Sequence, residues 1–266
     1  MARFSGHNGG VFGDSLLVED CEDAWNEQVI GSVTASLDNA DYKVGAGSAK
    51  FAVDAAFGTG VIGSEVITKD LSLYKSLYAW VKSSVALDAS DWAILLDEHA
   101  LCASPLKTLY LPGLAAATWK RVNLPLGDAS GLTALISIGL NQSVDKGAMN
   151  FWIDDARALK LLAGISHWTL DLEYTVHQAR GFEDAGAPNK IVAVHDWKGS
   201  FSGFKAEQPL TIGTQVIIAF AETRTVTQQW VGEAVISHVA ADVDTESPIT
   251  YSYDFDGIGA LEIPTA

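Results

Sequence analysis

Residues 168–176, WTLDLEYTV, alternate apolar and polar side chains throughout. Alternation with period two puts one set of side chains on each face of a strand, so this stretch predicts a β-strand with one buried face. The same period recurs in residues 78–81, 119–126, 151–153, 215–223, 229–240 and 249–255. Clusters of Gly, Asp, Asn and Pro separate these runs at the spacing of sandwiches and barrels. We therefore expect an all-β protein, whose only helical candidates are short segments at 114–117 and 131–137.

A second stretch, residues 196–204 (DWKGSFSGF), combines alternating aromatics with two glycines. Gly199 and Gly203 weaken a strand and are typical of a bend or of close backbone approach. Trp197 and Phe201 are expected to pack, and the three-residue step to the next Phe predicts a bulge or a strand end near Gly203. Phe201 stands where a nucleophile elbow requires Ser, so the stretch carries no catalytic signal.

Composition and charge limit the function. The chain has 266 residues, enough for one large or two ordinary domains, and 48% hydrophobic with 19% charged residues is normal for a packed protein. The formal net charge of -16 argues against a protein that grips DNA, but not against one that lets DNA pass. No apolar run has the length of a membrane span, and no signal peptide is visible. We expect a soluble protein synthesised in the cytoplasm.

The cysteines and one mixed cluster are candidates for redox or metal chemistry. Cys21 and Cys102 are expected to be two separate buried thiols, with a single bridge as the alternative. Asp97, Glu98 and His99 lie close to Cys102, but no second cluster in the sequence completes a zinc site. We interpret this cluster as solvated charges at a loop or strand end.

Asp242, Asp244 and Glu246 resemble part of a calcium loop. Ser247 and Tyr253 stand where such a loop requires Gly and a bidentate Glu, so we expect a turn between strands. No Ser/His/Asp arrangement and no pair of carboxylates with acid–base spacing emerges from the sequence. The chain is therefore not expected to be an enzyme.

The first long block resembles the β-jelly roll of carbohydrate-binding modules, the galactose-binding-like sandwich. The segments that carry the resemblance follow one another in the family's order. They are LLVEDCEDAW (16–25), VTASLDNADYKVGAGSAKFAVD (33–54), LYAWVKSS (77–84), TWKRVNLPL (118–126), ISIGL (136–140) and FWIDDARAL (151–159). The resemblance rests on a pattern of strands, so it implies a fold and not an activity.

The second block resembles the tube protein of long non-contractile phage tails. The segments are ISHWTLDLEY (165–174), a long loop (177–195), DWKGSFSGF (196–204), TQVIIAFAE (214–222), WVGEAVISHVAAD (230–242) and SPITYSYDFDGIGALE (247–262). The opening MARFSGHNGGVFG (1–13) is similar to the first strand and turn of that family. An apolar helix that the family commonly has after DWKGSFSGF is shortened or lost here.

Together the two resemblances imply an insertion. The first and last strands of a jelly roll lie close together, and insertions are tolerated at exposed hairpin tips. We expect a tail-tube-type β-sandwich or barrel made of residues 1–14 plus 161–266, with an inserted jelly-roll domain at residues 15–160.

The tail-tube resemblance implies a structural virion protein. Such subunits form stacked homohexameric rings joined by β-pairing, with residues 177–195 and the N-terminal segment reaching neighbours and 196–204 as assembly surface. Expected partners are the chain itself, tape-measure and tail-terminator proteins, and viral DNA that passes without specific binding; no membrane is involved. The expected location is the virion tail, with synthesis in the host cytoplasm. The expected lumen carboxylates are Asp171, Glu173, Glu222, Glu233, Asp254 and Asp256.

The jelly-roll resemblance implies two ligands. Modules of this type often hold one structural calcium between their first and last strands, and Asp20, Glu22 and Asp155, with Asp154, supply oxygen ligands at those places. No cofactor is required otherwise. The alternative function is a decoration or adhesin protein whose jelly roll binds surface glycans. A platform of Trp25, Trp80, Trp92, Trp119 and Trp152 would serve it, although core packing is the expected role of most of them.

Overall fold

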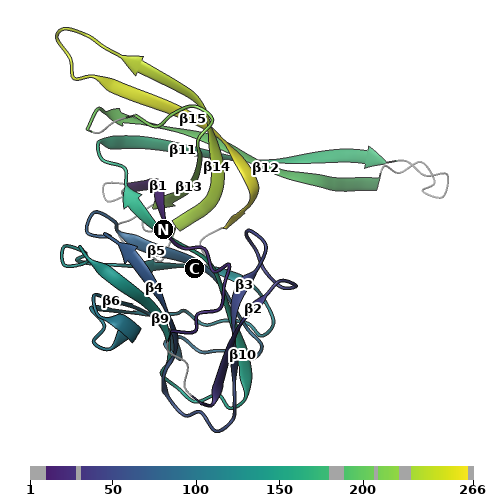
Figure 1. The fold of residues 1–266 in the computed structure, drawn as a ribbon. Coiled ribbons are helices and arrows are strands. Elements are labelled where there is room, and N and C mark those ends of the chain that lie inside the picture. Colours follow the sequence, from purple (N-terminus) through teal and green to yellow (C-terminus); the bar gives the residue numbers. More distant parts are fainter. Residues whose placement is uncertain (1–9, 28–30, 180–188, 207–208, 222–228, 263–266) are drawn as a thin grey trace, which may run out of the picture. The chain divides into compact units, whose positions relative to one another are not determined.

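The computed structural model describes residues 10–27, 31–179, 189–206, 209–221 and 229–262. The chain divides into two compact units, one of Ser15–Lys160 and one of Met1–Asp14 with Leu161–Ala266. These boundaries coincide with those expected from the sequence. We call residues 15–160 the inserted unit and the remainder the split unit. Both are all-β and their described strand pairs are antiparallel (Figure 1).

The inserted unit is a two-sheet structure around one hydrophobic core. Its strands are β2 (Val33–Asp38), β3 (Ser48–Val53), β4 (Gly60–Lys69), β5 (Ser76–Ser83), β6 (Trp92–Asp97), β7 (Lys107–Tyr110), β8 (Lys120–Pro125), β9 (Leu135–Gln142) and β10 (Met149–Leu161), preceded by β1 (Gly10–Glu19). One sheet has the order β2-β3-β10-β5-β8, and the other has the order β4-β9-β6-β7. Trp25, Phe51 and Trp92 are fully buried, and Trp92 stacks on Phe151 with ring centroids 4.2 Å apart.

Three strands of this unit, β4, β6 and β7, lie outside both the runs with period two and the segments that carry the jelly-roll resemblance. The residues of β6 are all buried, so its sequence WAILLD shows no alternation. Strands β4 and β7 complete the same sheet around it. The two helical candidates were wrong: residue 114 makes an isolated bridge, and residues 135–137 begin β9. Within the described residues, the one helical turn is a 3-10 turn at Ala100–Cys102, and no helix is long and apolar enough to span a membrane.

Strand β1 links the two units. It runs without interruption from Gly10 to Glu19, whereas the sequence suggested two separate opening strands. Gly10, Val11 and Phe12 pair with Ala221, Phe220 and Ala219, so the start of β1 belongs to the sheet of the split unit. The chain returns after β10 through a turn at Gly164, which has φ +80. Contact of residues 1–9 with a neighbour lies outside the described residues.

The split unit is one antiparallel sheet folded over an aromatic core. Its strands are β11 (Ile165–Ala179), β12 (Asn189–Phe204), β13 (Gln215–Ala221), β14 (Gln229–Asp242) and β15 (Thr250–Glu262). They follow the order β11-β12-β15-β14-β13-β1. Phe201, Phe220 and Phe255 are fully buried, and Phe220 stacks on Phe255 at 5.2 Å between centroids. Trp197 packs against Phe255 at 5.9 Å.

The longest hairpin of the split unit leaves the sheet as a two-stranded arm (Figure 1). Strands β11 and β12 remain paired from Ile165↔Gly203 to Ala179↔Asn189, but β12 pairs with β15 only over Lys198–Phe204. The predicted loop at 177–195 was therefore wrong at both ends, because the strands continue to Ala179 and resume at Asn189. We call the pairs from Tyr174↔His195 to Ala179↔Asn189 the arm.

Gly199 and Gly203 allow the backbone of β11 and the turn before it to approach β12 closely within the split unit. A Cβ on Gly199 would lie 2.2 Å from the carbonyl oxygen of Thr169, and one on Gly203 would lie 2.0 Å from that of Gly164. The register shifts between Ile165 and His167, opposite Gly203, which confirms the predicted bulge. Trp197 and Phe201 are buried as predicted. Residues 198–204 are thus paired on both sides by strands of the same chain, and the role of the stretch as an assembly surface stays a prediction.

Candidate functional site

The first candidate is an acidic face on the split unit. Pairing places Asp171, Lys198 and Asp256 in one row across β11, β12 and β15. The next row holds Thr169, Ser200, Asp254 and His238. Because side chains alternate along a strand, these rows share one face of the sheet and the buried aromatics occupy the other. We define the acidic face by its carboxylates: Asp171, Glu173, Asp196, Glu233, Asp254 and Asp256.

The predicted lumen residues that the structure describes all lie on this face. Asp171, Glu173, Asp254 and Asp256 are exposed and Glu233 is half-buried; Glu222 lies outside the described residues. The cations among them do not neutralise the face. Lys198 lies 3.4 Å from Glu173, and the ring of His238 lies 3.3 Å from Asp254. Such exposed pairs contribute little stability, so the carboxylates are available as a surface charge.

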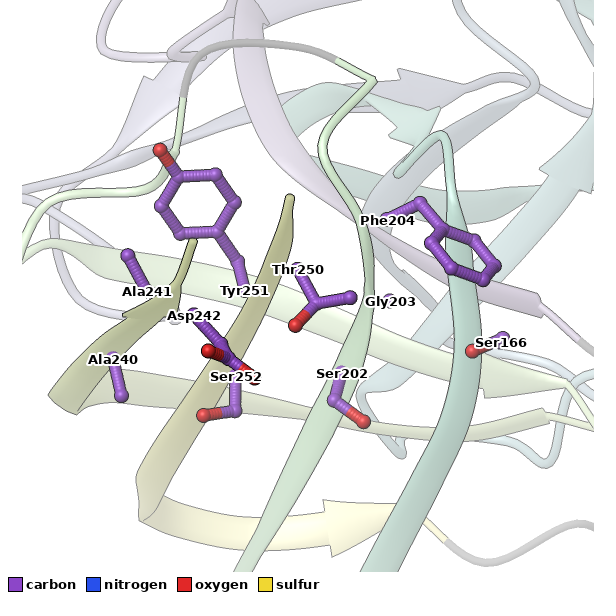
Figure 2. Close-up of a pocket in the computed structure, with 10 residues that line it drawn as sticks. All are labelled: Ser166, Ser202, Gly203, Phe204, Ala240, Ala241, Asp242, Thr250, Tyr251 and Ser252. Atoms are coloured by element: carbon purple, nitrogen blue, oxygen red, sulfur yellow. The ribbon is translucent and has the colours of Figure 1, made fainter. Parts of the chain in front are cut away.

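The acidic face ends in a shallow groove of about 240 Å³ (Figure 2). Ser202 and Ser252 form one row of its floor, and Phe204, Thr250 and Asp242 form the next row. Its lining mixes the hydroxyl groups of Ser and Thr with apolar surface from Phe204 and Tyr251, and Asp242 is the one charged side chain among the described residues that line it.

The second candidate is the outer face of the β2-β3-β10-β5-β8 sheet in the inserted unit. Lys50, Trp152 and Lys82 lie in one row across β3, β10 and β5, and Arg121 lies beside Trp80 on β8 and β5. Both lysine Nζ atoms lie 5.1 Å from the Trp152 ring. The guanidinium of Arg121 lies 4.5 Å from the Trp80 ring. Cations therefore lie over the indole faces.

A loop from residue 39 to residue 47 completes this face. Its backbone is held by the buried carboxylate of Asp154, which accepts the N–H groups of Lys43 at 2.6 Å and Val44 at 3.0 Å. The Lys43 Nζ then lies 5.3 Å from the ring of Trp80. We define the tryptophan–cation face as Trp80, Trp119 and Trp152 with Lys43, Lys50, Lys82 and Arg121.

Two aspartates lock the indoles of this face. Trp152 donates its indole N–H to Asp38 at 3.0 Å, and Lys50 donates to the same carboxylate at 3.1 Å. The bond from Trp152 is the main cause that lowers the pKa of Asp38 to about 2. Trp119 donates to Asp41 at 2.7 Å, and Lys82 pairs with that carboxylate too. The rings of Trp119 and Trp152 are thus held in place before any ligand binds.

The structure divides the five predicted platform tryptophans into two groups. Trp25 and Trp92 are fully buried in the hydrophobic core, as expected for most of them. Trp80 and Trp119 are half-buried and Trp152 is 7% exposed, all outside that core. The prediction that most of the five are buried therefore holds for Trp25, Trp92 and Trp152 and was wrong for Trp80 and Trp119, although Trp152 packs on the outer side of its sheet. The cations were missed, although the alternation of Trp80 and Lys82 signals that they share a face.

The predicted calcium ligands are not gathered around one point. Asp155 has φ 46 at a bulge of β10, and its carboxylate accepts Arg157 Nε at 2.7 Å. Asp20 accepts the N–H of Glu22, and Glu22 accepts the N–H of Ala46 at 2.7 Å. Among the described residues, no three His, Cys, Asp or Glu side chains form a metal cluster. The calcium stays a prediction.

Negative charge nevertheless accumulates near the end of β1. Asp154 is fully buried, and its Oδ1 atom makes no hydrogen bond. Burial, with the charges of Asp155 and Glu22, raises its pKa above the ordinary value. Burial likewise raises the pKa of Glu19 to about 7. An orphaned buried carboxylate oxygen among other carboxylates fits a cation better at Asp154 than at Asp155, which Arg157 already neutralises.

The remaining clusters are structural. Cys21 and Cys102 are separate, free and buried, which confirms the first of the two alternatives. Asp97 is buried and accepts the N–H groups of Ser104 and His99, so the interpretation as solvated charges was wrong for Asp97 and Cys102. Burial raises the pKa of Cys102 to about 11, which makes it a poor nucleophile. Asp242 ends β14, and residues 243–246 are exposed between β14 and β15, as expected for a turn.

Comparison with known proteins gives weak likenesses. No family model and no curated protein matches the chain. The tail of an empty GTA particle with C6 symmetry is similar at 13% identity and TM-score 0.30, covering 41% of this chain and 87% of that one. A family 30 carbohydrate-binding module is similar at 13% identity and TM-score 0.38, covering 57% and 91%.

A tandem CBM22 domain of Xyn10C from Paenibacillus barcinonensis is similar at 12% identity and TM-score 0.35, covering 96% of this chain and 86% of that one. Likenesses of this size do not assign a function. The function has to be argued from the residues of the chain itself.

Proposed function

We propose that this chain is a non-enzymatic structural subunit of a phage-type tail tube, in which hexameric rings stack around a conduit. The acidic face is the observation that carries the proposal. Its carboxylates share the exposed side of β11, β12, β15 and β14, opposite the aromatic core. If this face lines the conduit, it repels the phosphate backbone of a genome. The nucleic acid then slides and does not adsorb.

The edge strand and the arm support assembly through β-pairing. Within the described residues, β11 has a strand partner on one side only, although it is fifteen residues long. A long edge of this kind exposes unpaired N–H and C=O groups that another chain can pair. The arm has only two strands, and a two-stranded hairpin is marginal in water without further packing. A neighbouring subunit would supply that packing for both.

The partners and location follow from this role. Further copies of the chain form the rings, and tape-measure and tail-terminator proteins contact the tube inside and at its end. Viral DNA passes without specific binding. The protein resides in the virion tail, with the inserted unit as a decoration.

Deletion of the arm tests the assembly step. In the variant, residues 177–191 are replaced by Asn-Gly, a sequence that favours a tight two-residue hairpin turn. Analytical ultracentrifugation and electron microscopy of the purified full chain follow assembly over rising concentration and after addition of tape-measure protein. We expect rings and tubes from the unmodified chain, and monomers with unchanged far-UV circular dichroism from the variant. Persistent monomers of the unmodified chain under every condition would contradict the proposal.

A second candidate function is supported by the tryptophan–cation face. Three indoles lie on one outer sheet face, and two of them, Trp152 and Trp119, are held by Asp38 and Asp41, so they form a preorganised surface for a polymer outside the tube. Preorganisation lowers the entropy cost of binding. We propose glycan binding by the inserted unit as this second function. A glycan array with the unmodified chain and a Trp80→Ala variant tests this function. If the unmodified chain binds no glycan of the array, the function is rejected.

A structural calcium in the inserted unit is also proposed, with Asp154 as the central ligand together with Glu22. The orphaned Oδ1 of Asp154 supports it. Addition of calcium after chelation is expected to raise the melting temperature of the inserted unit. An Asp154→Asn variant should lose that response.

A further inference from the structure

We infer that the tryptophan–cation face takes an anionic polysaccharide, one that carries a carboxylate or phosphate on its repeating sugars. This inference rests on the proposed glycan-binding function of the inserted unit and names its ligand class. Five cation–ring contacts of the described residues lie on this one face, two over Trp80, two over Trp152 and one over Tyr78, the neighbour of Trp80 on the same side of β5. The four cations of this face outnumber Asp38 and Asp41, the carboxylates that pair with Lys50 and Lys82, on a chain whose net charge is -16.

The position of the cations argues against simple stacking of a neutral sugar. The Trp152 ring has Lys50 and Lys82 over it at 5.1 Å each, and only 7% of the residue is exposed. The Trp80 ring has Lys43 and Arg121 over it at 5.3 and 4.5 Å. An approaching polymer therefore meets ammonium and guanidinium groups before it meets indole. The groups that it must offer are anions, because charge-assisted hydrogen bonds are the strong ones.

The cations differ in whether they already form an ion pair with a carboxylate of the chain. Lys50 pairs with Asp38, and Lys82 pairs with Asp41. Lys43 is exposed, and it makes no ion pair with another described residue. Its backbone is fixed by Asp154, so its side chain projects from an ordered loop. Lys43 is therefore the cation best placed to pair with a ligand, and Arg121 lies over the same ring.

The geometry suits a polymer better than a single small anion. Lys50 and Lys82 lie two strands apart in one row, about 10 Å by the spacing of neighbouring strands. Arg121 and Lys43 lie at the next row, beside Trp80. A chain with one anion on each repeating unit can contact several of these cations at once. The half-buried edges of Trp80 and Trp119 remain for the apolar faces of its sugars.

A matched pair of polymers tests the inference. The probes are polygalacturonate and the same polymer with its carboxylates methyl-esterified, titrated into the full chain by isothermal calorimetry at two salt concentrations. We expect binding of the acidic polymer that weakens with salt, and at least tenfold weaker binding of the ester. The Lys43→Gln variant should bind the acidic polymer about tenfold more weakly. Lys75→Gln, which removes an exposed charge in the turn before β5, should bind as the unmodified chain does.

The outcomes separate this inference from the function on which it rests. Equal binding of acid and ester overturns the anionic ligand but leaves glycan binding standing. Absence of binding to both polymers, and to every glycan of the array, overturns both. Equal affinity for polyglutamate or single-stranded DNA of the same length also overturns the inference, because it would show a general polyanion patch. Unchanged binding by both Lys43→Gln and Arg121→Gln, with intact circular dichroism, would place the ligand elsewhere.

Discussion

The acidic face and the tryptophan–cation face both arise because side chains alternate along a strand, but their charged groups are arranged differently. On the split unit, carboxylates stand on the exposed side of a sheet and the aromatics lie beneath them on the other side. On the inserted unit, aromatics and cations share the outer side, and Asp38 and Asp41 tie them together. The first arrangement leaves charge free to act at a distance. The second fixes charge on a surface built for contact.

The stabilities of the two units can be told apart by a substitution that weakens the core of only one of them. Phe201 is fully buried and stacks on Tyr253 at 4.8 Å, so Phe201→Ala removes core packing in the split unit alone. We expect a loss of about 3–5 kcal/mol in its free energy of unfolding. Differential scanning calorimetry should show one transition moved and the other, from the inserted unit, unmoved. Ser252→Ala on the exposed side of the same sheet is the control, and a shift of both transitions would contradict independent cores.

The aspartate lock of the tryptophan–cation face can be broken at Asp38. In Asp38→Asn the donors of Trp152 and Lys50 lose their charged acceptor, which should cost the inserted unit about 1–3 kcal/mol at pH 7. The pKa of Asp38 is lowered to about 2, so its stabilising effect is present above the ordinary pKa and is lost as the pH falls from about 4 through 2.

Urea titrations of both proteins at pH 7, 4 and 2 measure this effect. The difference between the unmodified chain and Asp38→Asn should shrink towards pH 2. A difference that stays constant with pH would show that the carboxylate charge does not hold the indole.

Glu19 gives a pH dependence of the opposite sign, because its charged form destabilises the folded state. Burial raises its pKa to about 7, so the stability it contributes is complete below the ordinary pKa of glutamate and is lost as the pH rises through 7. Glu19→Gln should therefore raise the melting temperature at pH 8 by a few degrees, of the order expected for about 1 kcal/mol, and change it little at pH 4. Melting curves in the presence of a chelator check this; equal shifts at both pH values would contradict it.

The acidic face should show the smallest effect on stability and a clear effect on DNA. Asp254→Lys with Asp256→Lys changes exposed positions, so the free energy of unfolding should move by no more than about 0.5 kcal/mol. Affinity for duplex DNA, negligible in the unmodified chain, should become measurable at low salt. Fluorescence anisotropy with labelled DNA tests it. The control variant, Asp145→Lys with Asp128→Lys on the inserted unit, carries the same change in charge. It should not gain a comparable affinity for DNA.

Much of the fold follows from local pattern. Trp168 and Leu170 alternate with exposed polar residues because one face of β11 packs against the aromatic core there, and the structure confirms that strand. The fully buried β6 could not be recognised in the same way, because both of its faces are covered and its side chains have no period. The outer strands of the arm were missed although residues 191–194, IVAV, form a short β-branched run of the kind that is typical of a strand.

The candidate sites were less predictable than the fold. Alternation alone places Asp254 and Asp256 on one face, but only pairing in the sheet brings Asp171 into their row. The tryptophan–cation face depends on a contact between Lys43 and Asp154, which are 111 residues apart. No local signal predicts such a contact. The bulge at Asp155, which turns its carboxylate to Arg157, is equally invisible in the sequence.

The most direct test asks whether the acidic face lines the inside of an assembled tube. Cys21 and Cys102 are 0% and 3% exposed, so an introduced thiol can be labelled selectively. Asp254→Cys and, as an exposed control on the inserted unit, Lys75→Cys are treated with a large maleimide-polyethylene glycol before and after assembly. We predict that both react in the monomer, and that only Lys75→Cys reacts in the tube. Equally rapid labelling of Asp254→Cys in tubes would contradict the central claim.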